Sequence, residues 1–186
     1  MALTQTTPLE LGFEAPDFWL PDVVSGEQKT FADINGEKGT LVMFICNHCP
    51  YVIHVRDELL NLAREYMPKG IGFVAISAND AESYPADSPE KMKELAEEEA
   101  FPFPYLYDES QDVARAYEAA CTPDFNLFDA SGRCVYRGRL DGSTPGNDIP
   151  LSGADMRRAL DAVLRGEIID WQQEPSMGCS IKWKKD

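Results

Sequence analysis

The chain has 186 residues, a formal net charge of −15 and a hydrophobic content of 44%. This length and composition are typical of an ordinary globular protein, and we expect a single domain over residues 1–186. The strong negative charge argues against nucleic acids and anionic membrane surfaces as partners, because both would repel the protein.

Residues 1–6 show neither the basic stretch nor the apolar core of a secretion signal. No apolar run approaches the roughly 18 residues of a membrane span. The chain has five cysteines. Without a signal, this odd number predicts a reducing, cytoplasmic location, where a Cys-x-x-Cys pair is catalytic or metal-binding rather than a structural bridge.

The N-terminal part of the sequence predicts a β-hairpin followed by a β-α-β unit. Phe-Trp-Leu at 18–20 and Lys-Thr-Phe at 29–31 flank a polar segment with Ser-Gly-Glu at 25–27, which is the pattern of a hairpin. The apolar run 40–45 predicts a central strand, and apolar residues at 3–4 spacing after Pro50 predict an amphipathic helix. Residues 72–77 form an unbroken apolar run, which is typical of a strand buried on both faces of a parallel sheet.

The C-terminal half predicts several shorter elements: a helix opened by Ser88-Pro89, a strand at 105–107, a helix over 112–119 capped by Ser110, a hairpin of 125–128 and 134–137, and a last helix capped at 152–155. The tail, about residues 167–186, has no helical or strand period, and we expect an extended segment. This element order predicts an α/β fold in which a mixed central β-sheet carries helices on both faces.

Two cysteines follow the first central strand directly, in the run Cys46-Asn47-His48-Cys49-Pro50. A thiol at the first turn of a helix meets unpaired backbone N–H groups and the positive end of the helix dipole, which favour its thiolate. A second thiol one turn later lies close enough to attack a mixed disulfide that the first one forms. The pattern therefore predicts thiol–disulfide exchange, for which we expect no cofactor and no metal.

The element order and the place of this cysteine pair resemble the thioredoxin superfamily. The resemblance is closer to its redoxin branch, which holds the alkyl hydroperoxide reductase and thiol-specific antioxidant proteins and the TlpA-like oxidoreductases. Three segments carry it: the N-terminal segment 12–20, the Cys-x-x-Cys motif, and Cys-Thr-Pro-Asp-Phe at 121–125. Blocks at 46–52, 105–110 and 178–183 also resemble a subfamily of thioredoxin-like proteins with a Cys-Asn-His-Cys motif.

The resemblance implies a thiol–disulfide oxidoreductase whose partners are protein or small-molecule thiols and disulfides. In such an enzyme Cys46 is the attacking thiol and Cys49 the resolving thiol, and we expect Cys46 to be the exposed thiol of low pKa. His48 lies beside Cys46, and we expect it to stabilise that thiolate through a hydrogen bond or a positive charge. Since one pKa unit corresponds to about 1.4 kcal/mol, even a modest contact between His48 and Cys46 would change the stability of the thiolate.

Further site residues lie outside the cysteine motif. Thr122 and Pro123 resemble the segment that holds a cis-proline opposite the disulfide, and we expect the backbone of Thr122 to be free to pair with an extended substrate. Cys121 lies two residues before Pro123, and Cys179 lies in the tail. Either could be a third redox thiol, although burial in the core is the commoner fate of a free cysteine.

A thiol peroxidase that uses Cys46 is an alternative. Peroxiredoxins carry Pro-x-x-x-Thr-x-x-Cys, in which the Thr hydroxyl positions the peroxide. Counting back from Cys46 gives Met43 and Gly39 in place of Thr and Pro. The sequence also departs from the thioredoxins proper, which place a buried Asp six residues before the first cysteine, since that position is Thr40. A proton acceptor for Cys49 must therefore lie elsewhere.

A second alternative is a non-catalytic module that binds zinc or a partner protein. The two cysteines of the motif, together with His48 and His54, could supply soft ligands. A closed zinc site needs four ligands that converge on the ion, whereas His48 lies inside the Cys-x-x-Cys loop. The sequence therefore favours redox chemistry over zinc.

Overall fold

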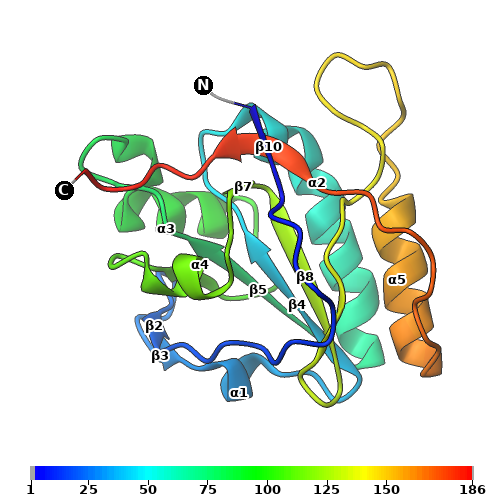
Figure 1. Ribbon diagram of the computed structural model, residues 1–186. Helices are drawn as coiled ribbons and strands as arrows, with labels where there is room; N and C mark the ends of the chain where they lie inside the picture. The colour runs from blue at the N-terminus through cyan, green and yellow to red at the C-terminus, as the bar shows by residue number, and fades with distance from the viewer. Residues whose placement is uncertain (1–2, 186) are drawn as a thin grey trace.

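The computed structural model describes residues 3–185. The elements follow in the order β1 (Leu3–Gln5), β2 (Leu20–Pro21), β3 (Gln28–Lys29), α1 (Phe31–Ile34), β4 (Gly39–Phe44), α2 (Pro50–Tyr66), β5 (Ile71–Ser77), α3 (Pro89–Glu98), β6 (Tyr105–Tyr107), α4 (Asp112–Ala116), β7 (Cys121–Thr122), β8 (Asp124–Asp129), β9 (Cys134–Tyr136), α5 (Ala154–Arg165) and β10 (Met177–Ser180), with short 3-10 helices at Met67–Lys69 and Pro85–Asp87 (Figure 1). Among the described residues, no helix is both long enough and apolar enough to span a membrane.

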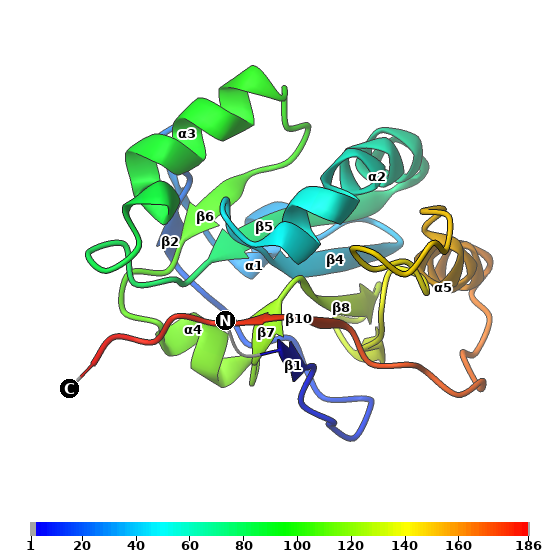
Figure 2. The same cartoon turned by 90° about the horizontal axis from the view of Figure 1, so that it is seen from above.

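A five-stranded mixed sheet forms the centre of the molecule, in the order β6-β5-β4-β8-β9. Strands β4, β5 and β6 are parallel, whereas β8 runs antiparallel to β4 and to β9. Helices α2, α3 and α5 pack on one face, and α1 and α4 lie on the other (Figure 2). The structure thus confirms the predicted α/β architecture with helices on both faces of a mixed sheet.

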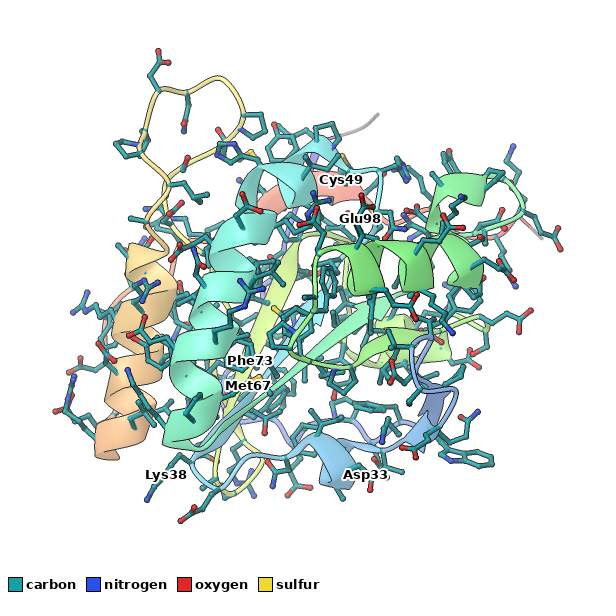
Figure 3. All side chains as sticks on the ribbon, turned by 180° about the vertical axis from the view of Figure 1, so that it is seen from behind. Asp33, Lys38, Cys49, Met67, Phe73 and Glu98 are labelled. Carbon is teal, nitrogen blue, oxygen red and sulfur yellow. The ribbon has the colours of Figure 1, made fainter. Side chains whose placement is uncertain are left out.

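The cysteine motif lies where the central strand β4 passes into α2. Every residue of β4 is buried, so this strand leaves the middle of the sheet with its path fixed on both sides. Helix α2 begins at Pro50, whose ring suits the first helical position, and Cys49 is its N-cap residue. Figure 3 shows Cys49 at the end of α2 nearest β10, and Met67 at the opposite end of the helix.

Several predicted boundaries shift because of local capping. The N-terminal hairpin forms between β2 and β3, but the chain turns into the short helix α1 where the sequence predicted strand. The reason is a capping box in which Thr30 and Asp33 each accept a hydrogen bond from the other's backbone N–H. Helix α5 begins after Gly153 without a side-chain cap from Ser152. The carboxylate of Asp141 instead accepts from the backbone N–H groups of both residues, at 2.7 and 2.6 Å.

Helix α4 also differs from its prediction. It spans Asp112–Ala116 and ends earlier than expected, and its N-cap residue is Gln111, whose backbone is left-handed. Ser110 still contributes, because its hydroxyl oxygen accepts a hydrogen bond from the N–H of Asp112 at 3.2 Å. Helix α3 begins as predicted, with the Ser88 side chain as its cap.

The tail holds a strand that its sequence did not predict. Strand β10 forms the middle of a second, three-stranded sheet, between β1 and β7. Its register places Cys179 opposite Leu3 on one side and opposite Thr122 on the other. A Cβ atom on Gly178 would lie 1.9 Å from the carbonyl oxygen of Thr122, so only glycine allows this close approach. Backbone pairing, rather than an alternating side-chain pattern, holds the tail in place.

This close approach predicts the effect of a single methyl group. Gly178→Ala should force β10 away from β7 and lower the free energy of unfolding by about 1–3 kcal/mol, the usual cost of overpacking. Gly142→Ala is the matched control, because its Cβ would find its nearest atoms 3.7 Å away. Denaturant unfolding and amide hydrogen exchange over residues 177–180 measure the effect. Equal stability and equal exchange in the two variants would contradict the described position of β10.

Candidate active site

Cys46 and Cys49 are both buried, with exposed fractions of 2% and 0%. Cys46 lies in the loop after β4, and Cys49 caps α2. The expectation that Cys46 is an exposed thiol is therefore wrong in this structure. Asp87, at the end of the 3-10 helix Pro85–Asp87, bonds to the loop between the two cysteines, and Cys179 on β10 contacts Cys49.

Thr122 is the residue that both cysteines touch. Its hydroxyl oxygen lies 3.5 Å from the Cys46 sulfur, and its carbonyl oxygen lies 3.2 Å from the Cys49 sulfur. The peptide bond between Thr122 and Pro123 is cis, as the resemblance implied. The segment before β8 therefore faces the cysteine pair.

The backbone of Thr122 is not free. Strand β10 pairs with β7 in antiparallel fashion and places Cys179 opposite Thr122. We expected an extended substrate to pair with this edge, and the structure overturns that expectation, because the chain's own tail holds the position. A substrate reaches the site by another approach unless β10 leaves.

Cys179 joins the pair as a third thiol. Its sulfur lies 2.7 Å from that of Cys49. Cys121, the other candidate, is buried in β7, and its sulfur donates a hydrogen bond to the carbonyl oxygen of Pro123, at 3.6 Å, rather than to a sulfur of the motif. Burial raises the pKa of Cys121. The structure therefore brings Cys179, but not Cys121, into contact with the motif.

The thiolate is favoured at Cys49 rather than at Cys46. Hydrogen bonds from the Cys46 thiol, from the Cys179 thiol and from the backbone N–H of Val52 lower the pKa of Cys49, whereas burial acts to raise it. The hydrogen bond to Cys49, burial and the nearby carboxylate of Asp87 raise the pKa of Cys46. These contacts act in the opposite sense to the expectation that Cys46 has the lower pKa. The largest of them is the contact with the Cys46 thiol, and the N–H of Val52 in the first turn of α2 adds to it.

Asp87 organises the loop, and the sequence analysis did not find it. Its side chain is fully buried and accepts four hydrogen bonds: from the backbone N–H groups of Asn47 (2.8 Å) and His48 (3.3 Å), from His48 Nδ1 (2.5 Å) and from Asn79 Nδ2 (2.8 Å). The only sequence signal was an acidic residue in a polar loop, which is normally solvent-exposed. Here it fixes the backbone between the two cysteines.

His48 is held away from a direct hydrogen bond with Cys46. Its ring bonds to Asp87 and stacks on Tyr84, with ring centroids 5.5 Å apart and planes 6° apart. One of its ring nitrogens still lies within 4.8 Å of the Cys46 sulfur. Any effect of His48 on the pKa of the cysteines must therefore act through charge rather than through the expected hydrogen bond.

Cys46, His48 and Asp87 could in principle hold a metal ion, since their ligand atoms lie within 4.8 Å of one another. The group offers three ligands, whereas a closed zinc site needs four. Both oxygens of Asp87 already accept hydrogen bonds, one of them from His48 itself. His54 does not belong to this group and bonds to the hydroxyl of Ser143 at 2.8 Å. The residues present therefore satisfy one another without a metal.

Comparison with known proteins gives the family. A solved structure of an uncharacterised conserved protein from Geobacillus kaustophilus is 55% identical, has a TM-score of 0.98 and covers 100% of this chain and 98% of its own. A thiol-disulfide oxidoreductase named ResA from the same organism is 29% identical over 69% of this chain and 69% of its own. A Mycobacterium tuberculosis protein whose name proposes a peroxiredoxin is 26% identical over 63% of this chain and 69% of its own.

The fold and the family agree. Solved thioredoxin-like proteins share the architecture, which confirms the predicted thioredoxin-like fold. The sequence model of the Redoxin family matches residues 10–155, from before the N-terminal hairpin to the start of α5. That range includes both cysteines of the motif and the cis-proline. This chain therefore belongs to the Redoxin family of thiol oxidoreductases.

Proposed function

We propose that this protein is a thiol–disulfide oxidoreductase in which Cys46 and Cys49 form a reversible disulfide. The observation that carries the proposal is that the sulfurs of Cys46 and Cys49, on either side of the loop before α2, both contact Thr122, the residue before the cis-proline. In the forward direction a substrate disulfide gains two electrons and two protons and leaves as two thiols. The protein then holds one disulfide between Cys46 and Cys49.

The order of attack follows from the shielding of Cys49. The Cys49 sulfur is enclosed by the Thr122 carbonyl and by Cys179 on β10, so a substrate meets Cys46 first. The Cys49 thiolate takes the proton of Cys46 as Cys46 attacks one sulfur of the substrate disulfide and the substrate S–S bond breaks. The first substrate sulfur leaves and takes that proton from Cys49, so Cys49 is a thiolate again. Cys49 then attacks the Cys46 sulfur of the mixed disulfide, the Cys46–Cys49 bond forms, and the second substrate sulfur leaves and takes a proton from solvent. Cys49 is thus first the base and then the resolving thiol.

Asp87 and His48 act as positioning residues in this proposal. The Asp87 carboxylate disfavours a thiolate on Cys46, since like charges repel, and the hydrogen bond of His48 Nδ1 to that carboxylate disperses part of its charge. His48 thereby stabilises the reduced, thiolate form of the pair. Stabilising the reduced form makes a disulfide more oxidising.

Substitution of each cysteine separates the two roles. With oxidised glutathione as the probe, Cys49→Ser should accumulate a glutathione mixed disulfide on Cys46, because no resolving thiol remains. Cys46→Ser should accumulate none, and the wild-type protein should pass through the adduct without accumulating it. Intact-mass and peptide mass spectrometry after acid quenching measure the adducts.

Cys134→Ser is the matched control, since Cys134 is buried in β9, within the apolar cluster on the other face of the sheet, and its sulfur donates to the carbonyl oxygen of Tyr136. It should behave like the wild type. A stable adduct on Cys49 in the Cys46→Ser protein, with none on Cys46 in the Cys49→Ser protein, would reverse the proposed order. Absence of any Cys46–Cys49 disulfide in Cys179→Ser, where no third thiol can displace that bond, would remove the proposal.

A thiol peroxidase is the second candidate function. The Thr122 hydroxyl at 3.5 Å from the Cys46 sulfur favours it, because peroxidases need a hydroxyl beside the reactive thiol, and one relative's name proposes a peroxiredoxin. Fast peroxide reduction also needs donors that hold both oxygens as the O–O bond breaks. The peroxidase motif that supplies such a donor is replaced here by Met43 and Gly39.

We therefore expect slow reduction of hydrogen peroxide, at a rate close to that of an ordinary free thiolate. Stopped-flow mixing of the reduced protein with peroxide measures the rate, and Thr122→Val serves as the variant that removes the hydroxyl. A rate orders of magnitude above that of a free thiolate, lost in Thr122→Val, would establish the peroxidase instead.

A further inference from the structure

We infer that Cys179 is a third redox thiol, which attacks the Cys46–Cys49 disulfide at Cys49 and moves the bond to the Cys49–Cys179 pair. This inference rests on the proposed redox role of Cys46 and Cys49. It assigns to the C-terminal strand a chemical part in the reaction. Strand β10 lies outside residues 10–155, the range that the family model matches, so the family alone does not imply it.

The contact between the two sulfurs is already close. The Cys179 and Cys49 sulfurs lie 2.7 Å apart. A disulfide bond is about 2.05 Å long, so bond formation requires the sulfurs to approach by less than about 1 Å. Both side chains are buried, with exposed fractions of 5% and 0%, so solvent thiols do not readily compete for this encounter.

The tail is anchored on both sides of Cys179. The Ser176 hydroxyl donates to the carbonyl oxygen of Pro123 at 2.7 Å, and the N–H of Lys182 donates to Asn79 Oδ1 at 2.9 Å. Between these anchors β10 pairs with both β1 and β7. A nucleophile held in this way reacts as part of the same molecule, which raises its effective concentration far above that of a free thiol.

Cys179 also lies on the strand edge that an extended substrate would use. Register places it directly opposite Thr122, the residue before the cis-proline. The tail therefore lies on the site as a substrate strand would, with its thiol directed at the resolving cysteine rather than at Cys46. The arrangement is that of a built-in exchange partner.

The exchange step is redox-neutral. The Cys179 sulfur, as the thiolate, attacks the Cys49 sulfur, the Cys49–Cys179 bond forms, and the Cys46–Cys49 bond breaks. Cys46 leaves as a thiolate and takes up the proton that Cys179 gave up. One disulfide and one thiol exist before and after the step, so no external oxidant or reductant is needed. The consequence is a free Cys46 thiol in the oxidised protein.

A purely structural role gives a different result. In that case Cys179 would only share a hydrogen bond with Cys49, and the oxidised protein would hold the Cys46–Cys49 disulfide with Cys179 as its free thiol. The location of the free thiol in the oxidised protein therefore distinguishes the two roles.

For the test, the folded full-length protein is oxidised with oxidised glutathione and quenched in acid. Free thiols are then labelled with an alkylating agent, and peptide mass spectrometry maps the disulfides. In oxidised wild type we expect label on both Cys46 and Cys179. Label on Cys46 should be at least about tenfold greater than in oxidised Cys179→Ser, where the Cys46–Cys49 bond holds both sulfurs. Label on Cys179 alone in oxidised wild type would overturn the inference.

A second arm isolates the new bond. Cys46→Ser should form a Cys49–Cys179 disulfide, and Cys46→Ser/Cys179→Ser should not. If the Cys46→Ser protein folds, as judged by circular dichroism, and forms no Cys49–Cys179 disulfide, the inference is wrong. If this variant does not fold, the positions of free thiols and disulfides in the oxidised wild type decide.

The two proposals fail in distinguishable ways. Cys179→Ser retains Cys46 and Cys49, so the Cys46–Cys49 disulfide in this variant tests the proposed function alone. If the Cys46–Cys49 bond forms in Cys179→Ser but the Cys49–Cys179 bond never forms in proteins that retain Cys179, only the role of Cys179 is overturned. If the Cys46–Cys49 bond does not form in Cys179→Ser, the proposed function is wrong, and the exchange step is wrong with it.

Discussion

The buried carboxylate of Asp87 fixes the loop between β4 and α2, and the positions of both motif sulfurs depend on that loop. A buried carboxylate is costly unless hydrogen-bond donors surround it. Two backbone N–H groups of the loop, the His48 ring and the Asn79 amide are those donors. The hydrogen bonds that offset the burial of the charge also set the path of the backbone. Loss of the carboxylate would therefore release the loop as well as change its charge.

Thr122 connects this loop to the rest of the site. Its hydroxyl contacts Cys46, its carbonyl contacts Cys49, and its backbone pairs with the tail strand β10. The same residue thus faces the attacking thiol, the resolving thiol and the strand that carries Cys179. Because β10 can reach Thr122 only where Gly178 lacks a side chain, a single glycine links the tail to the redox centre.

Local sequence patterns predicted the sheet, the helix after Pro50 and the cis bond before Pro123, because each depends on short-range periodicity or on a recognisable motif. Contacts between residues far apart in the sequence determine the features that the sequence did not predict, namely the role of Asp87 and the strand in the tail. In the sequence, Asp87 looks like an ordinary acidic residue of a loop. The C-terminal tail that contains β10 shows no helical or strand period, because backbone pairing with the distant strands β1 and β7 holds it in place. The contacts that favour a thiolate on Cys49 come from Cys179, which is distant in the sequence, as well as from the helix start, which the sequence did predict.

The central claim is that Cys46 and Cys49 form a two-electron redox pair whose thiolate is stabilised by its surroundings. The most direct measurement is the reduction potential of the protein, found by equilibration with defined mixtures of reduced and oxidised glutathione and mapping of the disulfides. The account predicts a two-electron couple above thioredoxin's value of about −270 mV, toward about −120 mV. A couple at or below thioredoxin's value would contradict the stabilised thiolate, and the absence of any two-electron couple would contradict the redox pair itself.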